Sequence, residues 1–294
     1  MPTTFIAAAE VVYANLATLF ERAFANYLVP IRTSPGAMEA RNRIEDVDLF
    51  ASQIALHGTA QVALALVARR GRRSRIAAMG VVLEARGSGV ARELLDKVTG
   101  DARDRGDDSL VLECIASNER ALRLYRRAGF VTTRRLVGWR AGALAPEAHR
   151  IVEIDPAELG RALARSDDGR LPWQLAPESL AALTAPMRGW TIDGSAFAAG
   201  SVLEHEVSVR AVFTRPERRR QGHAARLVRG LAAAFAPLPL AMAPLAPEAL
   251  GAELAAHLGV VPHELAQVEM AFPLASTAAG SGAGGVASSV APRL

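Results

Sequence analysis

Apolar residues recur in two different periods along the first 140 residues of this chain. Spacings near three and four, from Val11 to Phe20, predict a helix within residues 6–29 that Pro30 ends. Further helices are expected at 31–41, 90–101 and 118–125. Apolar runs bounded by turn residues predict strands at 48–55, 61–68, 76–83, 110–113 and 131–139. Strands alternating with helices in this way predict a mixed sheet with helices on both faces.

The same kinds of pattern return after residues 141–147, which are expected to be a linker. Strands are expected at 150–155, 189–193, 196–203, 207–213 and 265–274, and helices at 156–166, 176–185, 225–235 and 247–258. From residue 276 the chain is Ala, Gly and Ser with almost no charge, and a disordered tail is expected. We therefore predict an α/β chain of mixed α+β type, with domains at 1–143 and 144–275 and a tail at 276–294.

Composition narrows the class of protein. No apolar run reaches the ~18 residues of a membrane span, and the N-terminus lacks the basic start of a secretory signal. A cytoplasmic protein without membrane contact is expected. Cys114 is the single cysteine, which argues against a disulfide framework and a cysteine-rich zinc site; no metal is expected. The net charge of +4 is carried almost entirely by arginine, which with abundant alanine is typical of a GC-rich bacterial genome.

One stretch carries more chemistry than the rest. The predicted strand at 76–83 is followed by the turn Arg86-Gly87-Ser88-Gly89 and by a helix that begins at Val90. Such a turn directs backbone N–H groups and a helix N-terminus at one spot, where phosphate binds. Arg92 stands where a dinucleotide fingerprint needs Gly or Ala, and a P-loop is excluded because the single lysine, Lys97, is misplaced.

Two motifs in this half resemble those of the GNAT superfamily of acyl-CoA N-acyltransferases. The first is Arg86-x-x-Gly89-x-Ala91, and the second is Asn-x-x-Ala-x-x-Leu-Tyr-x-x-x-Gly-Phe from Asn118 to Phe130. The resemblance implies two domains, each with a central mixed, mostly antiparallel sheet flanked by helices. It also implies acetyl-CoA as co-substrate and an amine as acceptor.

The resemblance assigns binding roles to named positions. Backbone groups of Val81, Val82 and Leu83 would bind the pantetheine arm. The pyrophosphate would lie on Arg86, Gly87, Ser88, Gly89, Val90 and Ala91, with Asn118 on the pantetheine side or fixing the loop. Phe24, Tyr27, Leu28 and Pro30 are candidates for the acceptor pocket, although each could simply pack a helix on the sheet.

Tyr125 and Glu113 are the candidate catalytic residues. In the superfamily a tyrosine at the position of Tyr125 often protonates the leaving thiolate; the alternative is that it only packs and orients the cofactor. Glu113 precedes it by 12 positions (125 − 113), as in GNAT enzymes that acetylate N-terminal amines of ribosomal proteins. Glu113 could accept the proton of the amine or simply pair with an arginine. Cys114 faces away from Glu113 on a strand, so a thiol nucleophile is not expected.

The loop motif occurs a second time, as Arg219-x-x-Gly222-x-Ala224. Its residues Arg219, Arg220, Gln221, Gly222, His223 and Ala224 could form a second cofactor site, a solvated face or a nucleic-acid patch. The second motif has no counterpart near residues 246–258. We therefore expect chemistry in the first half only.

Three functions remain open at this stage. The first is acetyl transfer from acetyl-CoA to an amine of a small molecule or a protein, by direct attack on the thioester in a ternary complex. The second is a non-catalytic acyl-CoA sensor. The third, a nucleic-acid-binding module, is disfavoured because the basic runs lack interleaved aromatic residues.

Overall fold

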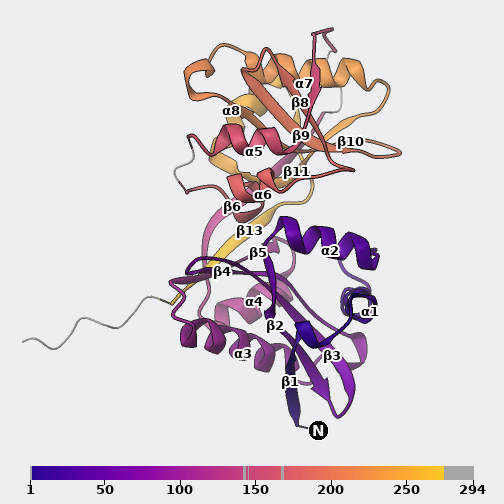
Figure 1. The fold of residues 1–294 in the computed structure, drawn as a ribbon, viewed down its shortest axis with the longest axis vertical. Helices are drawn as coiled ribbons and strands as arrows, with labels where there is room; N and C mark the ends of the chain where they lie inside the picture. Colours follow the sequence, from indigo (N-terminus) through magenta and orange to yellow (C-terminus); the bar gives the residue numbers. More distant parts are fainter. Residues whose placement is uncertain (1, 142–143, 145, 167–168, 275–294) are drawn as a thin grey trace, which may run out of the picture.

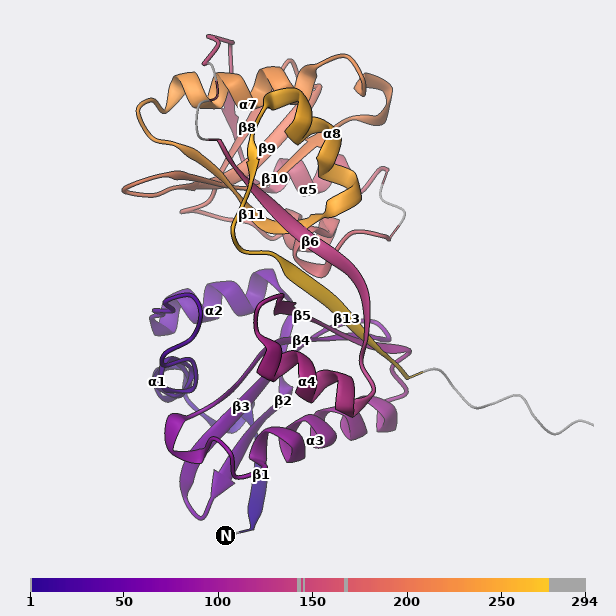
Figure 2. The same cartoon turned by 180° about the vertical axis from the view of Figure 1, so that it is seen from behind.

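The computed structural model describes residues 2–141, 144, 146–166 and 169–274. They form two lobes, joined by two long strands that run side by side between them (Figures 1 and 2). The predicted tail at 276–294 lies outside the described residues. None of the described helices is both long and apolar enough to cross a membrane.

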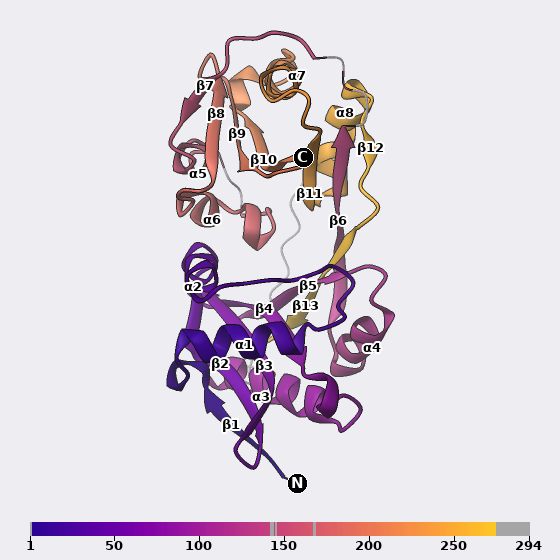
Figure 3. The ribbon, with the colours of Figure 1, turned by 90° about the vertical axis from the view of Figure 1, so that its right-hand side faces the viewer.

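The first lobe contains the elements from β1 to β6, and its helices α1 and α2 lie on one side of its sheet (Figure 3). Its strands are β1 (Thr3–Ala7), β2 (Val47–His57), β3 (Ala60–Arg70), β4 (Arg73–Val81), β5 (Ser109–Ile115) and β6 (Val131–Ala141). Its α-helices are α1 (Tyr13–Ala23), α2 (Pro35–Ile44), α3 (Val90–Asp104) and α4 (Glu119–Ala128), with 3₁₀ turns η1 (Ala8–Glu10) and η2 (Leu83–Ala85).

The second lobe repeats the strand, turn and helix order. Its strands are β7 (Val152–Ile154), β8 (Arg188–Ile192), β9 (Ala196–Val202), β10 (Val207–Thr214), β11 (Leu240–Pro247), β12 (Val261–Pro262) and β13 (Gln267–Pro273). Its helices are α5 (Ala157–Leu163), α6 (Pro177–Ala181), α7 (His223–Ala234) and α8 (Glu248–Leu258), with η3 (Trp173–Leu175) and η4 (Pro216–Arg218).

The lobes exchange strands. Along the sheet the order is β1-β2-β3-β4-β5-β13-β6-β11-β10-β9-β8-β7. All pairs are antiparallel except β4–β5 and β10–β11. The strand expected at 265–274 as the closing strand of the second half is β13, but it pairs with β5 and β6 of the first, placing Gln267 opposite Ile115 and Leu136. In turn, β6 pairs with β11. Such a long-range exchange leaves no local mark on the sequence.

The apolar pattern did not predict three strands: β1, β11 and the two-residue β12. β1 occupies the start of the segment expected to be helical, so the helix α1 runs only from Tyr13 to Ala23. β11 was not expected, since Pro244 and Pro247 lie within it and proline rarely enters a strand interior. The register of β11 against β6 shifts between Met242 and Ala246, so the prolines fall at or beyond an irregularity.

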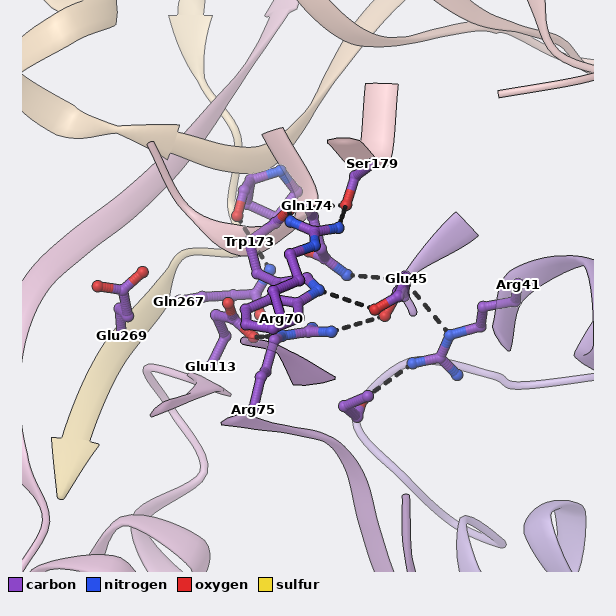
Figure 4. A network of polar contacts seen from close by, with 12 residues as sticks. Arg41, Glu45, Arg70, Arg75, Glu113, Trp173, Gln174, Ser179, Gln267 and Glu269 are labelled. Atoms are coloured by element: carbon purple, nitrogen blue, oxygen red, sulfur yellow. Dashed lines mark hydrogen bonds and ion pairs between the residues drawn. The ribbon is translucent and has the colours of Figure 1, made fainter. Parts of the chain in front are cut away.

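A tryptophan and an arginine fasten the lobes to each other. Trp173 of η3 lies within the core of the first half and donates its Nε1 hydrogen to the carbonyl of Glu45 (2.8 Å). The guanidinium of Arg70 lies over the Trp173 ring, 4.3 Å from its centroid, and donates to Ser179 Oγ (2.6 Å) (Figure 4). One buried and one partly buried hydrogen bond, together with the cation–π contact, hold the two halves in one arrangement.

Candidate functional site

The site begins where two parallel strands separate. β4 and β5 pair from Arg73 and Ser109 to Ile76 and Leu112, and no pairing continues beyond. A cavity of about 440 Å³ lies past this point, and we call it the loop cavity. Its wall includes the predicted Phe24, Tyr27, Val81, Arg86, Gly87, Gly89, Val90, Ala91, Asn118 and Tyr125. The tertiary structure therefore brings both sequence motifs to one place.

The edge of β4 offers backbone groups to this gap. Val82 donates its N–H to the carbonyl of Val62 on β3 (2.9 Å), so that N–H is not available to a ligand. Because N–H directions alternate along an antiparallel pair, the N–H of Val81 points the other way, away from β3. Of the three positions expected to bind pantetheine, Val81 is thus the best placed; Leu83 begins η2 and its side chain is exposed.

The turn after η2 presents unbonded N–H groups. Gly87 and Gly89 have φ of +86° and +96°, which favour glycine. In the described part of the chain, the N–H groups of Gly87, Gly89 and Ala91 have no recorded partner, and Gly89 is the N-cap of α3. Ser88 turns its hydroxyl to the carbonyl of Ala85 (2.7 Å). These N–H groups and the helix N-terminus fit a pyrophosphate.

Arg86 fixes this turn. Its Nε donates to the carbonyl of Val81 (3.1 Å), and its Nη2 donates to the carbonyls of Ala23 and Ala25 (3.1 and 3.0 Å). The side chain thereby ties the end of α1 to the end of β4 and to the loop. Its charge still lies at the cavity wall, beside the expected phosphate.

Asn118 and Tyr125 come from α4. Asn118 is the N-cap and accepts from the N–H of Ala121 through Oδ1 (3.2 Å), which is the preferred chemistry at that position. Tyr125 is 9% exposed, and no hydrogen bond of its hydroxyl is recorded among the described residues. Burial raises the pKa of Tyr125, so the phenol is protonated at neutral pH, as a proton donor must be.

A second cavity of about 420 Å³ adjoins the first, and we call it the junction cavity. Phe24, Tyr27, Asn118 and Tyr125 line both cavities. The second half contributes Gln174, Ala243, Pro244, Leu245, Leu265 and Gln267 to its wall. The phenyl ring of Phe24 stands edge-on to Tyr27 at 5.2 Å.

The close approach of α1 to β4 requires a glycine. A Cβ at Gly80 would lie 3.0 Å from both the Ala23 Cβ and the Phe24 ring. Glycine at this position therefore lets Phe24 reach the junction of the two cavities.

Glu113 lies on the wall of the junction cavity. Its Oε2 accepts from Arg75 Nε at 2.7 Å, and Arg75 also donates to Glu45 Oε2 at 2.6 Å (Figure 4). Its Oε1 is buried without a hydrogen-bond partner. The arginine pairing foreseen as the alternative for Glu113 is thus present, while one carboxylate oxygen stays free.

The two carboxylates that share Arg75 differ in acidity. Burial raises the pKa of Glu113, and Arg75 only partly opposes it. Burial also acts on Glu45, but Arg75 and Arg41 outweigh it and lower the pKa of Glu45 to about 2. Glu45 therefore holds the charge of Arg75, and Glu113 is the carboxylate with a pKa shifted toward neutrality, as a general base needs.

Cys114 alternates with Glu113 on β5, as expected. Burial raises the pKa of its thiol to about 12, so the thiol is protonated at neutral pH. Within the described ranges, no group of three or more His, Cys, Asp or Glu side chains could hold a metal ion.

Arg75 and Glu45 were not foreseen as site residues. Arg75 directly precedes the apolar run 76–83, and this position was a signal, because a charge that enters a buried strand requires a partner. Nothing local identified Glu45, which reaches the site from the end of α2.

The second half builds a similar loop. Gly222 is the N-cap of α7, with φ +79°, and Arg219 Nε donates to the carbonyl of Thr214, five residues earlier (3.3 Å). In the first half, Arg86 Nε likewise donates to the carbonyl of Val81, which is also five residues earlier. β10 and β11 pair only from Val207 to Val209, and a cavity of about 440 Å³ lies beyond, the second-half cavity. Of the six predicted loop residues, only Arg219 lines it.

The catalytic candidates have no chemical counterparts in this half. Counted from the helix N-cap, Asn118 corresponds to Pro247 of α8, and Tyr125 corresponds to Leu254. Counted from the last parallel pair, Glu113 corresponds to Ala243. All three substitutes are apolar and line the second-half cavity.

Comparison with known proteins agrees with this geometry. Residues 32–130 match the family model described as "Acetyltransferase (GNAT) family". A search of curated proteins found no match.

Solved structures share the fold at low identity. A tandem GNAT protein from the clavulanic acid biosynthesis pathway has a TM-score of 0.68 at 12% identity, covering 94% of this chain and 100% of that one. A putative acetyltransferase from Pyrococcus horikoshii has a TM-score of 0.63 at 14% identity, covering 92% and 89%. A GCN5-related N-acetyltransferase from Sphaerobacter thermophilus has a TM-score of 0.61 at 17% identity, covering 92% of this chain and 96% of that one. The chain therefore has a tandem GNAT fold.

Proposed function

We propose that this chain, whose residues 32–130 match the GNAT acetyltransferase family model, transfers an acetyl group from acetyl-CoA to an amine. The reaction is direct attack on the thioester in a ternary complex. The observation that carries the proposal is the adjacency of the loop cavity and the junction cavity, which share Tyr125 and Asn118. One cavity can hold the acyl donor while the other holds the acceptor.

Acetyl-CoA supplies the activated acyl group. On the loop, the free N–H groups of Gly87, Gly89 and Ala91 bind the pyrophosphate, and Arg86 adds charge. The Val81 N–H on the edge of β4 orients the pantetheine arm and polarises the thioester carbonyl. Holding donor and acceptor in adjoining cavities accounts for much of the expected acceleration.

Two side chains, Glu113 and Tyr125, carry out the proton transfers. An amine attacks only when neutral, and the free Oε1 of Glu113 accepts its proton, directly or through water. Tyr125 donates its phenolic proton to the departing thiolate. Arg75 keeps Glu113 in place by holding the other oxygen.

The second half completes the acceptor site without taking part in the chemistry. Gln174 and Gln267 line the junction cavity, and their side-chain amides are held by Glu45 Oε1 (3.2 Å) and the Pro244 carbonyl (2.9 Å). The acceptor is therefore an amine of a small molecule, or of a protein terminus or lysine that reaches between the lobes.

A panel of amines assayed by free-thiol release from acetyl-CoA tests the proposal. We expect acceptor-dependent thiol release with at least one amine class, together with an acetylated product identified by mass spectrometry. Tight acetyl-CoA binding without thiol release from any acceptor would favour the alternative function, a non-catalytic acyl-CoA sensor.

A further inference from the structure

The second-half cavity contrasts with the two cavities of the first half. Its wall is mainly apolar, with Leu163, Leu175, Phe213 and Leu254 among the side chains. Its volume of about 440 Å³ lies in the range of ~300–1,000 Å³ typical of small-molecule pockets. No role in acetyl transfer accounts for such a cavity.

One partly buried cation interrupts this apolar wall. Arg210 of β10 lines the cavity and donates through Nη2 to the backbone carbonyl of Gln174 (3.0 Å). Its Nε is buried without a partner, and across the described ranges no carboxylate forms an ion pair with it. Burial lowers the pKa of Arg210, because an enclosed guanidinium without an anion is poorly stabilised.

The surroundings of Arg210 also favour an anion. The charges of Arg41 and Arg75 lower the pKa of Arg210 further, and the charge of Glu45 opposes them. Glu45 already accepts from Arg75 and Gln174. Positive charge is therefore in excess on the side of the cavity that faces the first half.

We propose that the second-half cavity binds a small apolar carboxylate, an acid whose carboxylate pairs with Arg210 and whose hydrocarbon body lies among the leucines. Two N–H groups of one guanidinium can hold both oxygens of a carboxylate. The hydrocarbon body gains by leaving water for an apolar wall. This site does not depend on the proposed acetyl transfer.

Two observations argue against CoA as the occupant. Gly222 and its neighbours on the loop do not line the cavity, unlike Gly87 and Gly89 in the first half. Arg220 of the loop is instead engaged in an ion pair with Glu253 of α8.

Calorimetric titration of the full chain with octanoate, octylamine and 1-octanol tests the proposal. These probes share a hydrocarbon chain and differ in the charge of the head group. We expect octanoate to bind about tenfold or more tightly than either of the others, since hydrogen bonds to charged groups are the stronger ones. Equal affinity for octanoate and octylamine would overturn the proposal.

Substitutions in the second-half cavity test whether octanoate binds there. Arg210→Leu should reduce octanoate affinity to that of 1-octanol, Arg210→Lys should retain part of the preference, and Arg215→Leu, away from this cavity, should change nothing. Leu254→Trp should fill the cavity and remove binding of all three probes. Unchanged octanoate affinity in a folded Arg210→Leu protein, or in Leu254→Trp if the former does not fold, would contradict the assignment.

A competition experiment separates this ligand from CoA. With Gly89→Glu blocking the first loop, we expect no acetyl-CoA binding that octanoate displaces. Displaceable acetyl-CoA binding that Gly222→Glu abolishes would make the second half a cofactor site and overturn the proposal.

Discussion

The loop cavity and the second-half cavity occupy the same place in two copies of one fold, where parallel strands separate next to a glycine turn and a helix N-terminus. Their walls differ. Asn118 and Tyr125 line the first, whereas Pro247 and Leu254 line the second. The glycine turn is open to the cavity in one copy and mostly outside it in the other. The fold supplies the cavity, and a few side chains decide what the cavity can do.

A matched pair of glycine substitutions tests this contrast most strongly. Gly89→Glu places bulk and negative charge where the phosphate is expected, and we predict loss of measurable turnover and of acetyl-CoA binding. Gly222→Glu should leave most of the activity. Both glycines have positive φ, so the backbone strain is similar and circular dichroism can confirm that both variants are folded. The reverse outcome would move the active site to the second half.

Tyr125→Phe should produce the next largest effect. The ring and its packing remain while the proton donor is lost, so turnover is expected to fall ~10²–10⁴-fold with acetyl-CoA affinity nearly unchanged. Tyr13→Phe, in α1 and outside both cavities, is the control. Single-turnover kinetics should show the loss in the chemical step, and wild-type chemistry would refute the role of general acid.

Glu113→Gln should act mainly through pH. Glutamine can still accept from Arg75, but it cannot take a proton. We expect a fall of about tenfold to a hundredfold, smaller than for Tyr125 because water can also accept the proton. The limb of the pH–rate profile on which activity rises as Glu113 ionises should flatten. If the profile of the variant overlays that of the wild type at every pH, the base lies elsewhere.

Substitution of Glu45 should change the stability of the fold, whereas substitution of Glu113 should change the reaction rate. Its pKa falls from 4.5 to about 2 on folding, so ionised Glu45 stabilises the fold above its unfolded pKa, and this contribution is lost as pH falls from about 4.5 to 2. A shift of this size corresponds to roughly 3 kcal/mol. Glu45→Gln should lower the free energy of unfolding at pH 7 and flatten its decline in that window, as measured by urea denaturation across pH. An unchanged pH dependence would show that Glu45 is not the responsible group.

The smallest effects concern the fastening of the lobes. Arg70→Met removes the contacts to Trp173 and Ser179 and should destabilise the protein by about 1–2 kcal/mol. Arg72→Met breaks the exposed ion pair with Asp108 and should leave the denaturation midpoint nearly unchanged, because solvent screens such pairs. Equal shifts in the denaturation midpoint would mean that Arg70 does not fasten the lobes.

The sequence alone determined the features that depend on a few neighbouring residues. The turn from Arg86 to Ala91 and the start of α4 at Asn118 are set by glycine conformations and side-chain caps that act within a few residues. For this reason the two motifs and the tandem order were predictable, whereas the role of Tyr125 as general acid follows from the family resemblance and stays a prediction. The Asn118 cap and the positive φ of Gly89 are in place as such motifs require.

Only the tertiary structure decided which distant strands pair and which distant charged side chains meet. The exchange of β6 and β13, the strand β11 across its prolines, and the hold of Arg75 on both Glu45 and Glu113 depend on segments that are far apart in the chain. Hydrogen-bond pairing between strands and the satisfaction of buried charges are set by which segments meet, and many segments of similar composition could meet in principle. Only the folded chain shows that Arg210 is enclosed without an anion and that Glu113 keeps one oxygen free.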